Sequence, residues 1–211
     1  SVQRDLDEAL PLVAKAEVAL RGLNVKDFQM LKALKSPPVD ISNTFTCVLN
    51  LLCTVDPNVP VDKAGKLKTE KPWSTSLSLM ANPANFMTTL LGFKDKIDAD
   101  MVPANNFKAI RGALSDPNFT PEIIKGKSSA AGGLCDWIIN ITAYYDVFVS
   151  VEPKKLAAKA AKLRLADANE KKAELDTLVA KLTAELKVLQ DDFQKAMDEK
   201  NQAEAEAERC G

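Results

Sequence analysis

The side chains that most often carry out catalysis or bind metals are scarce in this chain. None of the 211 residues is histidine. Histidine is the commonest general base, the usual partner of a nucleophilic serine or cysteine, and a ligand in most zinc sites. No other catalytic spacing is present, so the sequence predicts a chain that is not an enzyme, with no metal site and no cofactor.

The four cysteines, Cys47, Cys53, Cys135 and Cys210, are the remaining reactive side chains, and they form no C-x-x-C pair. Cys47 and Cys53 are six residues apart, which on one helix points them to different sides, too far apart for a disulfide. We expect buried free thiols in a reducing compartment.

Two further motifs resemble ligand sites without completing them. The run Gly126-Lys127-Ser128 is similar to the end of a phosphate-binding loop, but Pro121 stands where that loop needs a glycine and no strand precedes it. A second run, Asp95, Asp98 and Asp100, lacks the glycine and closing glutamate of a calcium loop. We interpret these three carboxylates as solvated loop charges.

Basic side chains are the remaining candidates for binding. The formal net charge is −1, so a charged interface must be a local patch, and nothing indicates nucleic acid or a membrane surface as a partner. If the three groups of cations converge in the fold they form such a patch, whereas scattered ones only increase solubility. The groups are Lys26, Lys32 and Lys35, then Lys108 and Arg111, then Lys125 and Lys127.

The elements that must position these cations begin with two heptad-patterned arms. Apolar residues recur in steps of four and three over 2–23, and every seventh residue over 161–210 is alanine, leucine or cysteine. Such stripes predict an antiparallel two-helix coiled coil between the ends of the chain. Its many alanines, with Lys172 and Lys200 at core positions, predict a weakly packed seam in which other registers lie close in energy.

Between the arms the sequence predicts a helical head without strands. We expect one helix from the start to about Leu34, kinked at Pro11, and a second that begins after Ser36-Pro37-Pro38. A long loop over 54–72 and four further amphipathic helices follow, each with apolar residues on one face. The fold class is therefore all-α: an antiparallel two-helix coiled-coil stalk capped by a small helical-bundle head.

These patterns divide the chain into a stalk arm over 1–23, a head over 24–152 and a second arm over 153–211. No run of eighteen apolar residues and no signal peptide is visible. Because the chain lacks an initiator methionine and its second arm outruns the first, we expect a piece of a longer protein.

Several short motifs stand in the same order along the chain: ALP (9–11), KSPP (35–38), DPNFTPEI (116–123), AGGLCDW (131–137) and VEPK (151–154). Together with the arms they resemble the stalk tip and microtubule-binding domain of dynein heavy chains. The stretch 71–86 is similar to axonemal outer-arm forms in particular. The resemblance covers essentially the whole chain and implies a place in the axoneme of a cilium or flagellum, on the cytoplasmic side.

The resemblance implies that the head binds tubulin, while ATP is hydrolysed in an AAA+ ring that this chain does not contain. Matched by position, the resemblance implies that the residues in contact with tubulin are Lys26, Lys32, Lys35, Glu122 and Lys127. Secondary candidates are Lys108, Arg111 and Lys125. Two positions depart from the cytoplasmic pattern, Pro83 and Asp136. The neutral head predicts weaker tubulin affinity than in cytoplasmic relatives.

The mechanism implied is control of affinity by sliding of one arm along the other. Half a heptad corresponds to roughly 5 Å along a helix. The sliding must stop at the junction of stalk and head, for which Pro11 and Pro153 are the candidates.

An alternative reading is an adaptor whose head docks another protein, for instance an axonemal dynein light chain. A partly bare apolar patch at Phe86, Met87 and Leu91 would favour the adaptor. A clustered basic tip would favour tubulin.

Overall fold

The computed structural model describes residues 1–210 and divides into two compact units, Ser1–Lys154 and Lys155–Gly211. Every regular element among the described residues is a helix, and the single β-bridge among them pairs Val61 with Leu67. The predicted all-α fold class is confirmed. No described helix is both long and apolar enough to cross a membrane.

Two helices replace the single helix expected up to Leu34. Helix α1 (Val2–Arg21) buries its predicted stripe and carries Pro11 on its exposed side. It ends at Gly22, and α2 (Val25–Lys32) begins at once from Asn24. The Asn24 side chain accepts from the N–H of Asp27 and the Asp27 carboxylate accepts from the N–H of Asn24, which completes a capping box. The prediction of one helix was therefore wrong.

Helix α3 (Val39–Leu52) is the centre of unit 1 and begins after Pro38, as predicted. Eight of its fourteen residues are buried. Its last carbonyl groups are bound by Asn106, whose Nδ2 donates to the oxygens of Leu51 and Cys53 at 3.0 and 2.8 Å. These hydrogen bonds give the carbonyl groups at the end of α3 a donor, and the chain then enters the 54–71 loop.

Five short helices follow: α4 (Pro72–Met80), α5 (Pro83–Leu91), α6 (Phe93–Asp98), α7 (Ala104–Leu114) and α8 (Pro121–Lys125). Of these, α4 and α7 pack against α3, and α5 packs against α1, α4 and α6. Three of the five start with proline at the first helical position, where its missing N–H costs nothing. Helix α6 was not predicted. Its Asp98 pairs with Lys94 at 2.6 Å and accepts from the buried Tyr144 hydroxyl at 2.5 Å, so the reading of Asp98 as a solvated loop charge was wrong.

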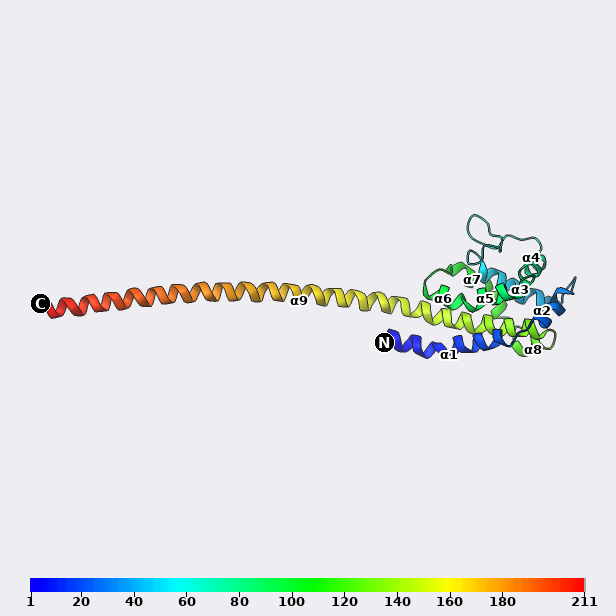
Figure 1. Ribbon diagram of the computed structural model, residues 1–211, viewed down its shortest axis with the longest axis horizontal. Coiled ribbons are helices and arrows are strands. Elements are labelled where there is room, and N and C mark those ends of the chain that lie inside the picture. The colour runs from blue at the N-terminus through cyan, green and yellow to red at the C-terminus, as the bar shows by residue number, and fades with distance from the viewer. Residues whose placement is uncertain (211) are drawn as a thin grey trace. The chain divides into compact units, whose positions relative to one another are not determined.

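Helix α9 (Ser129–Cys210) forms the second wall of unit 1 through its first part and continues as unit 2. Within unit 1 it runs antiparallel to α1 (Figure 1). Asp5 pairs with Lys154 at 2.7 Å, while Ala19 and Leu23 approach Gly133 at the other end of α1. Trp137 of α9 is fully buried and packs edge-on against Phe93 of α6 at 5.4 Å between ring centroids.

Unit 2 is one helix whose heptad residues face solvent. Its leucines, Val179, Val188 and Phe193 are all at least half exposed, and the predicted a/d stripe therefore has no apolar cover within this unit. Lysines and acids alternate along the rest of its surface.

All four cysteines are free, as predicted, and the three in unit 1 are buried. Loss of hydration raises the pKa of Cys47 to about 12, that of Cys135 to about 12 and that of Cys53 to about 11. These thiols are therefore protonated and unreactive at neutral pH.

Candidate functional site

One end of unit 1 brings α2 against the turn between α8 and α9. Side chains of α2 and its extension line one wall of a groove of about 250 Å³, and the residues from Lys125 to Ala130 line the other. Met30, at 67% exposed, stands on the rim. The groove places α2, the helix that carries Lys26 and Lys32, beside the turn that carries Lys125 and Lys127, a neighbourhood that the sequence alone could not predict.

The cations around this groove are exposed and differ in their pairing. Lys26 and Lys32 lie on α2, and Lys35 follows it; none of these three forms an ion pair among the described residues. Lys127, in contrast, forms an ion pair with Asp40 in the first turn of α3. We call the exposed surface of Lys26, Lys32, Lys35, Glu122, Lys125 and Lys127 the tip surface.

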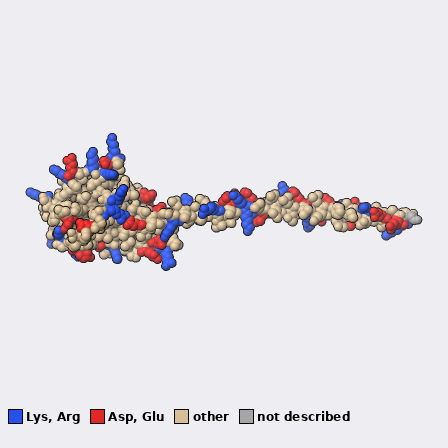
Figure 2. Space-filling view, turned by 180° about the vertical axis from the view of Figure 1, so that it is seen from behind, with Lys and Arg blue, Asp and Glu red and all other residues tan. Residues whose placement is uncertain are grey.

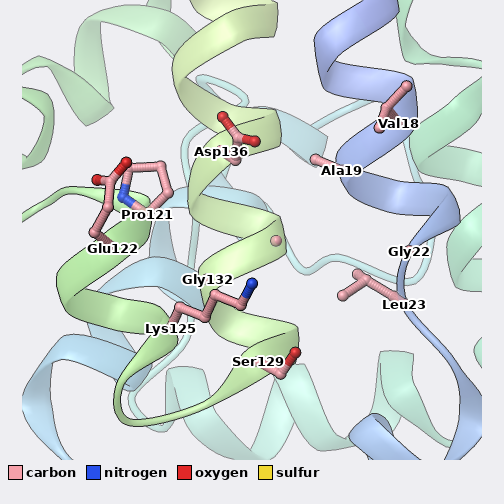
Figure 3. Close-up of a pocket in the computed structure, with 11 residues that line it drawn as sticks. Val18, Ala19, Gly22, Leu23, Pro121, Glu122, Lys125, Ser129, Gly132 and Asp136 are labelled. Carbon is pink, nitrogen blue, oxygen red and sulfur yellow. The ribbon is translucent and has the colours of Figure 1, made fainter.

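A second groove, of about 360 Å³, lies on the other side of the same turn, between α1, α8 and the start of α9 (Figure 3). Lys125 and Ser129 line both grooves. Glu122, in the first turn of α8, and Asp136 of α9 face it with the Lys125 side chain between the two chain segments. Helix α8 and the turn after it therefore lie between two open grooves.

Two glycines at the start of α9 set the position of α8. A Cβ atom on Gly132 would lie 2.7 Å from the Cα of Lys125 and 2.9 Å from its backbone nitrogen. A Cβ atom on Gly133 would lie 2.7 Å from Leu23 and 3.2 Å from the carbonyl oxygen of Ala19. The start of α9 can approach α8 on one side and α1 on the other only because these positions carry no side chain.

The α7 cations lie elsewhere. Arg111 forms a bidentate pair with Asp146 of α9, with 2.9 Å from Nη1 to Oδ2. This contact raises the pKa of the guanidinium and places it about 25 Å along α9 from Ser129, at 1.5 Å per residue. Lys108 lines a separate groove with the 54–71 loop. The three predicted groups therefore do not form one patch, although two of them do.

Both junction prolines lie inside helices. Pro11 is within α1 and Pro153 is within α9. Because Lys154 pairs with Asp5 and the two helices are antiparallel, Pro11 and Pro153 are offset by about five residues, or about 8 Å, along the helix pair. They interrupt the hydrogen bonding of the two helices at different levels of unit 1.

The sequence did not indicate two kinds of contributor to the tip surface. One is Asp40. From the sequence it is an acidic residue in the first turn of a helix, whereas in the structure it forms an ion pair with Lys127. The other is a set of exposed apolar side chains beside the cations: Met30 of α2, Val39 of α3 and Ile123 of α8. A strict one-face helical pattern hides such residues, because each lies outside the buried stripe.

The apolar patch named for the adaptor reading is exposed only in part. Phe86 is 1% exposed and packs edge-on against Phe28 at 5.9 Å. Met87 and Leu91 are partly buried against the core. Figure 2 shows basic and acidic side chains interspersed over one face of unit 1, consistent with the near-zero net charge.

Residues 1–211 match the family model described as the microtubule-binding stalk of dynein motor. The beta chain of the flagellar outer-arm dynein of Chlamydomonas reinhardtii is 35% identical over 218 residues, covering 98% of this chain and 4% of that protein. Human dynein axonemal heavy chain 9 is 36% identical over 171 residues, covering 81% of this chain and 4% of its own length. The chain thus spans a few per cent of the relatives it matches.

A solved structure, the microtubule-binding domain of dynein-c, has 32% identity to this chain with a TM-score of 0.54. It covers 73% of this chain and 96% of the solved one. The flagellar and axonemal relatives confirm the predicted resemblance to axonemal heavy chains. By sequence over its full length and by structure over most of it, the chain belongs to the family of dynein microtubule-binding stalks.

Proposed function

We propose that the tip surface is the tubulin-binding site of this chain, and that the chain works in a ciliary or flagellar axoneme as part of a dynein heavy chain. The observation that carries the proposal is the groove between α2 and the Lys125–Ala130 turn, which sets the helix that carries Lys26 and Lys32 beside a turn that carries Lys125 and Lys127, about 100 residues later in the chain. ATP hydrolysis would belong to an AAA+ ring in another part of the heavy chain.

The mixture of side chains on this surface suits a reversible contact. Lysines steer an acidic partner toward the tip and contribute modestly once bound, because exposed ion pairs are worth about 0–1 kcal/mol each. The exposed Met30 and Ile123 supply apolar contact area beside them. Glu122 limits the surface to partners that present a cation at that place.

The ion pair between Lys127 and Asp40 competes with tubulin for the Lys127 ammonium group. Binding of its ammonium to tubulin requires the pair with Asp40 to open or to be shared. We infer that Asp40 restrains affinity. Replacing it with serine should leave the fold intact and strengthen binding, since the pair is partly exposed.

The test is co-sedimentation of the chain with microtubules over a salt series. Lys32→Glu and Lys127→Glu should each weaken binding by about tenfold and reduce its salt dependence. Lys108→Glu is the matched control, being an exposed lysine of unit 1 outside the tip surface, and should change affinity less than twofold. Asp40→Ser separates a contact role of Lys127 from a structural one.

Two results would exclude this site. Equal losses for Lys108→Glu and Lys32→Glu would show that binding follows overall charge. Weaker binding after Asp40→Ser would show that Lys127 acts by holding α3, not by touching tubulin.

We further propose that affinity is controlled by sliding of α1 along α9. Within unit 1 the seam between them uses small side chains, Ala9 and Ala16 among them, and one exposed ion pair, Asp5 with Lys154. Little packing energy separates such a register from one shifted by a turn. Because α1 leads into α2 through three residues, and Leu23 touches Gly133, movement of α1 is transmitted to the tip surface.

Docking of an axonemal dynein light chain is a second proposal. It needs a surface beyond Phe86, Met87 and Leu91, and Met101 and Val149 are two of the exposed apolar residues of unit 1 outside the tip that can be tested for one. A Met101→Glu and Val149→Glu variant that still binds microtubules but loses a purified light chain would support it, and unchanged light-chain binding would exclude this surface.

A further inference from the structure

A third groove of unit 1 lies far from the tip surface, between the 54–71 loop and the beginning of α7. Its volume is about 480 Å³, larger than either groove beside α8. Lys66 projects from the loop side and Lys108 from α7, while Asn50 and Asn105 lie between them. A cavity of this size accommodates a segment of a few residues or a small ligand.

The loop wall of the groove is rigid in spite of the length of the loop. The Asp62 carboxylate accepts from the backbone nitrogens of Ala64 and Lys66 at 2.8 and 3.0 Å, and the Asp62 N–H donates to the oxygen of Lys66. The bridge between Val61 and Leu67 closes this turn. Lys66 is therefore held on a fixed backbone, and little backbone entropy is lost when its ammonium binds a ligand.

The opposite wall is fixed by Asn106, which is 3% exposed. Both N–H groups of its amide donate to the carbonyl oxygens of Leu51 and Cys53, so the helix end of α3 and the first turn of α7 are joined. Lys108 follows two residues later on α7. Lys108 is thus carried by a helix that is fixed to the end of α3, and it shares the lining of the groove with Lys66 of the loop.

The residues that line the groove carry a positive charge. No carboxylate is among them, and neither Lys66 nor Lys108 forms an ion pair within residues 1–210. Asp62 lies behind the loop wall, where its carboxylate accepts from the backbone of its own turn and keeps its charge. Cys53 at the groove is a neutral thiol that donates to the Leu49 oxygen. Among the lining residues an anionic ligand therefore meets two ammonium groups and no carboxylate.

The shape and the neutral donors decide what kind of anion fits. The lining contains no aromatic ring or arginine on which a base would stack, which disfavours nucleotides and nucleic acid. Asn50 and Asn105 offer amide groups that can both donate to and accept from a peptide backbone. We propose that this groove binds an extended peptide segment rich in consecutive aspartates or glutamates, with its carboxylates on Lys66 and Lys108.

This binding site is separate from the tip surface. It uses another pair of lysines and another pair of chain segments, so the two can be tested independently. Figure 2 shows basic side chains projecting from the edge of unit 1 at which the 54–71 loop lies in Figure 1, so an acidic segment would be attracted toward this edge before it entered the groove.

The test uses fluorescein-labelled hexaglutamate and, as the uncharged control, hexaglutamine, with fluorescence anisotropy at low salt. Hexaglutamate should bind and hexaglutamine should not. Lys66→Glu and Lys108→Glu should each weaken binding by about fivefold or more, because each removes one attraction and adds one repulsion. Lys63→Glu is the matched control: it lies exposed on the same loop outside the groove and should change binding less than twofold.

Three outcomes would overturn the proposal. Absence of hexaglutamate binding to the wild-type chain is the first. The second is a loss with Lys63→Glu as large as that with Lys66→Glu, which would show diffuse attraction by the loop. The third is an oligouridylate that binds as tightly and depends on the same two lysines, which would assign the groove to nucleic acid. Circular dichroism of each variant confirms that its helices are retained.

Discussion

At the scale of single residues, the tip surface depends on positions that carry no side chain. Gly132 lets the backbone of Lys125 approach α9, and nothing charged or aromatic is involved in that contact. The structural reason for the glycine is space, not backbone freedom, because the residue lies inside a helix.

We therefore predict that Gly132→Ala displaces α8 and weakens microtubule binding by about tenfold, since its Cβ would lie 2.7 Å from main-chain and side-chain atoms of Lys125. Co-sedimentation measures the effect. Gly112→Ala is the matched control on α7, where no atom lies within 4 Å of the new Cβ. It should raise stability by about 0.5–1 kcal/mol through helix propensity and leave binding unchanged. Wild-type affinity in Gly132→Ala would contradict the role of this contact.

The buried thiols make a prediction about alkaline stability. The folded chain keeps Cys47 and Cys135 protonated up to about pH 12, whereas an unfolded thiol ionises near its ordinary value of 9.0. Above pH 9 the unfolded state therefore binds fewer protons than the folded state, and stability falls as the pH rises. Each thiol contributes a slope of up to about 1.4 kcal/mol per pH unit.

Guanidinium unfolding at pH 8, 9 and 10 under reducing conditions measures that slope. Cys47→Ala should make it shallower by one thiol, even if the variant is less stable at pH 8. Cys210→Ala, at an exposed cysteine of unit 2, should not alter it. An identical slope in Cys47→Ala and wild type would show that this thiol does not contribute.

At the scale of elements, the tip surface is held by contacts at the ends of α2. Trp73 of α4 donates its indole N–H to the carbonyl oxygen of Leu34 at 2.9 Å, just beyond α2, and its ring packs edge-on against Phe45 at 5.3 Å. Lys32 and Lys35 flank this carbonyl along the chain. The hydrogen bond thus fixes the segment that presents them.

We predict that Trp73→Phe lowers stability by about 1–2 kcal/mol, because a partly buried carbonyl loses its donor while the aromatic packing largely remains. A fall of about 2–6 °C in the melting temperature should follow for a domain of this size. Microtubule binding should weaken as well. Trp73→Leu, which also removes the ring, should be less stable still. Wild-type stability in Trp73→Phe would show that the hydrogen bond to Leu34 contributes nothing and that Trp73 acts through packing alone.

The sequence predicted most elements of unit 1 and missed those decided by local capping or by tertiary contacts. The run Ser36-Pro37-Pro38 correctly marked the start of α3. The break after α1 was missed because its signal, Asn24 with Asp27, is two polar residues inside a continuing apolar pattern. Helix α6 was missed because six residues give too little periodicity, and its Asp98 is placed by Tyr144, 46 residues away.

The candidate site was predictable to a similar extent. The lysines could be identified by type, but their grouping depends on which helices meet, and heptad or one-face patterns do not contain that information. Arg111 illustrates the limit, because its partner Asp146 lies 35 residues away on α9. A cation that looks free in the sequence can be committed to an internal pair in the fold.

At the scale of the whole molecule, the question is how a change in the helix pair reaches the tip. Asp5 with Lys154 at one end and Leu23 with Gly133 at the other define one register of α1 on α9. Ser150 lies one turn before Lys154 on the same face of α9, which corresponds to a shift of about 6 Å. Two disulfides can therefore hold two registers about half a heptad apart.

We predict that the two locked forms differ in microtubule affinity by about tenfold, a typical coupling free energy of about 1.4 kcal/mol. In one, Asp5→Cys is paired with Lys154→Cys, which keeps the observed register; in the other, Asp5→Cys is paired with Ser150→Cys. Cys210→Ser in both prevents competing disulfides, and reduction should restore a common affinity.

Adding Pro11→Ala or Pro153→Ala to the two locked forms should reduce the difference in their affinity if the prolines absorb the shift between stalk and head. The same affinity in both oxidised forms would mean that the tip surface does not respond to the register of α1, and that control of binding must come from another part of the heavy chain.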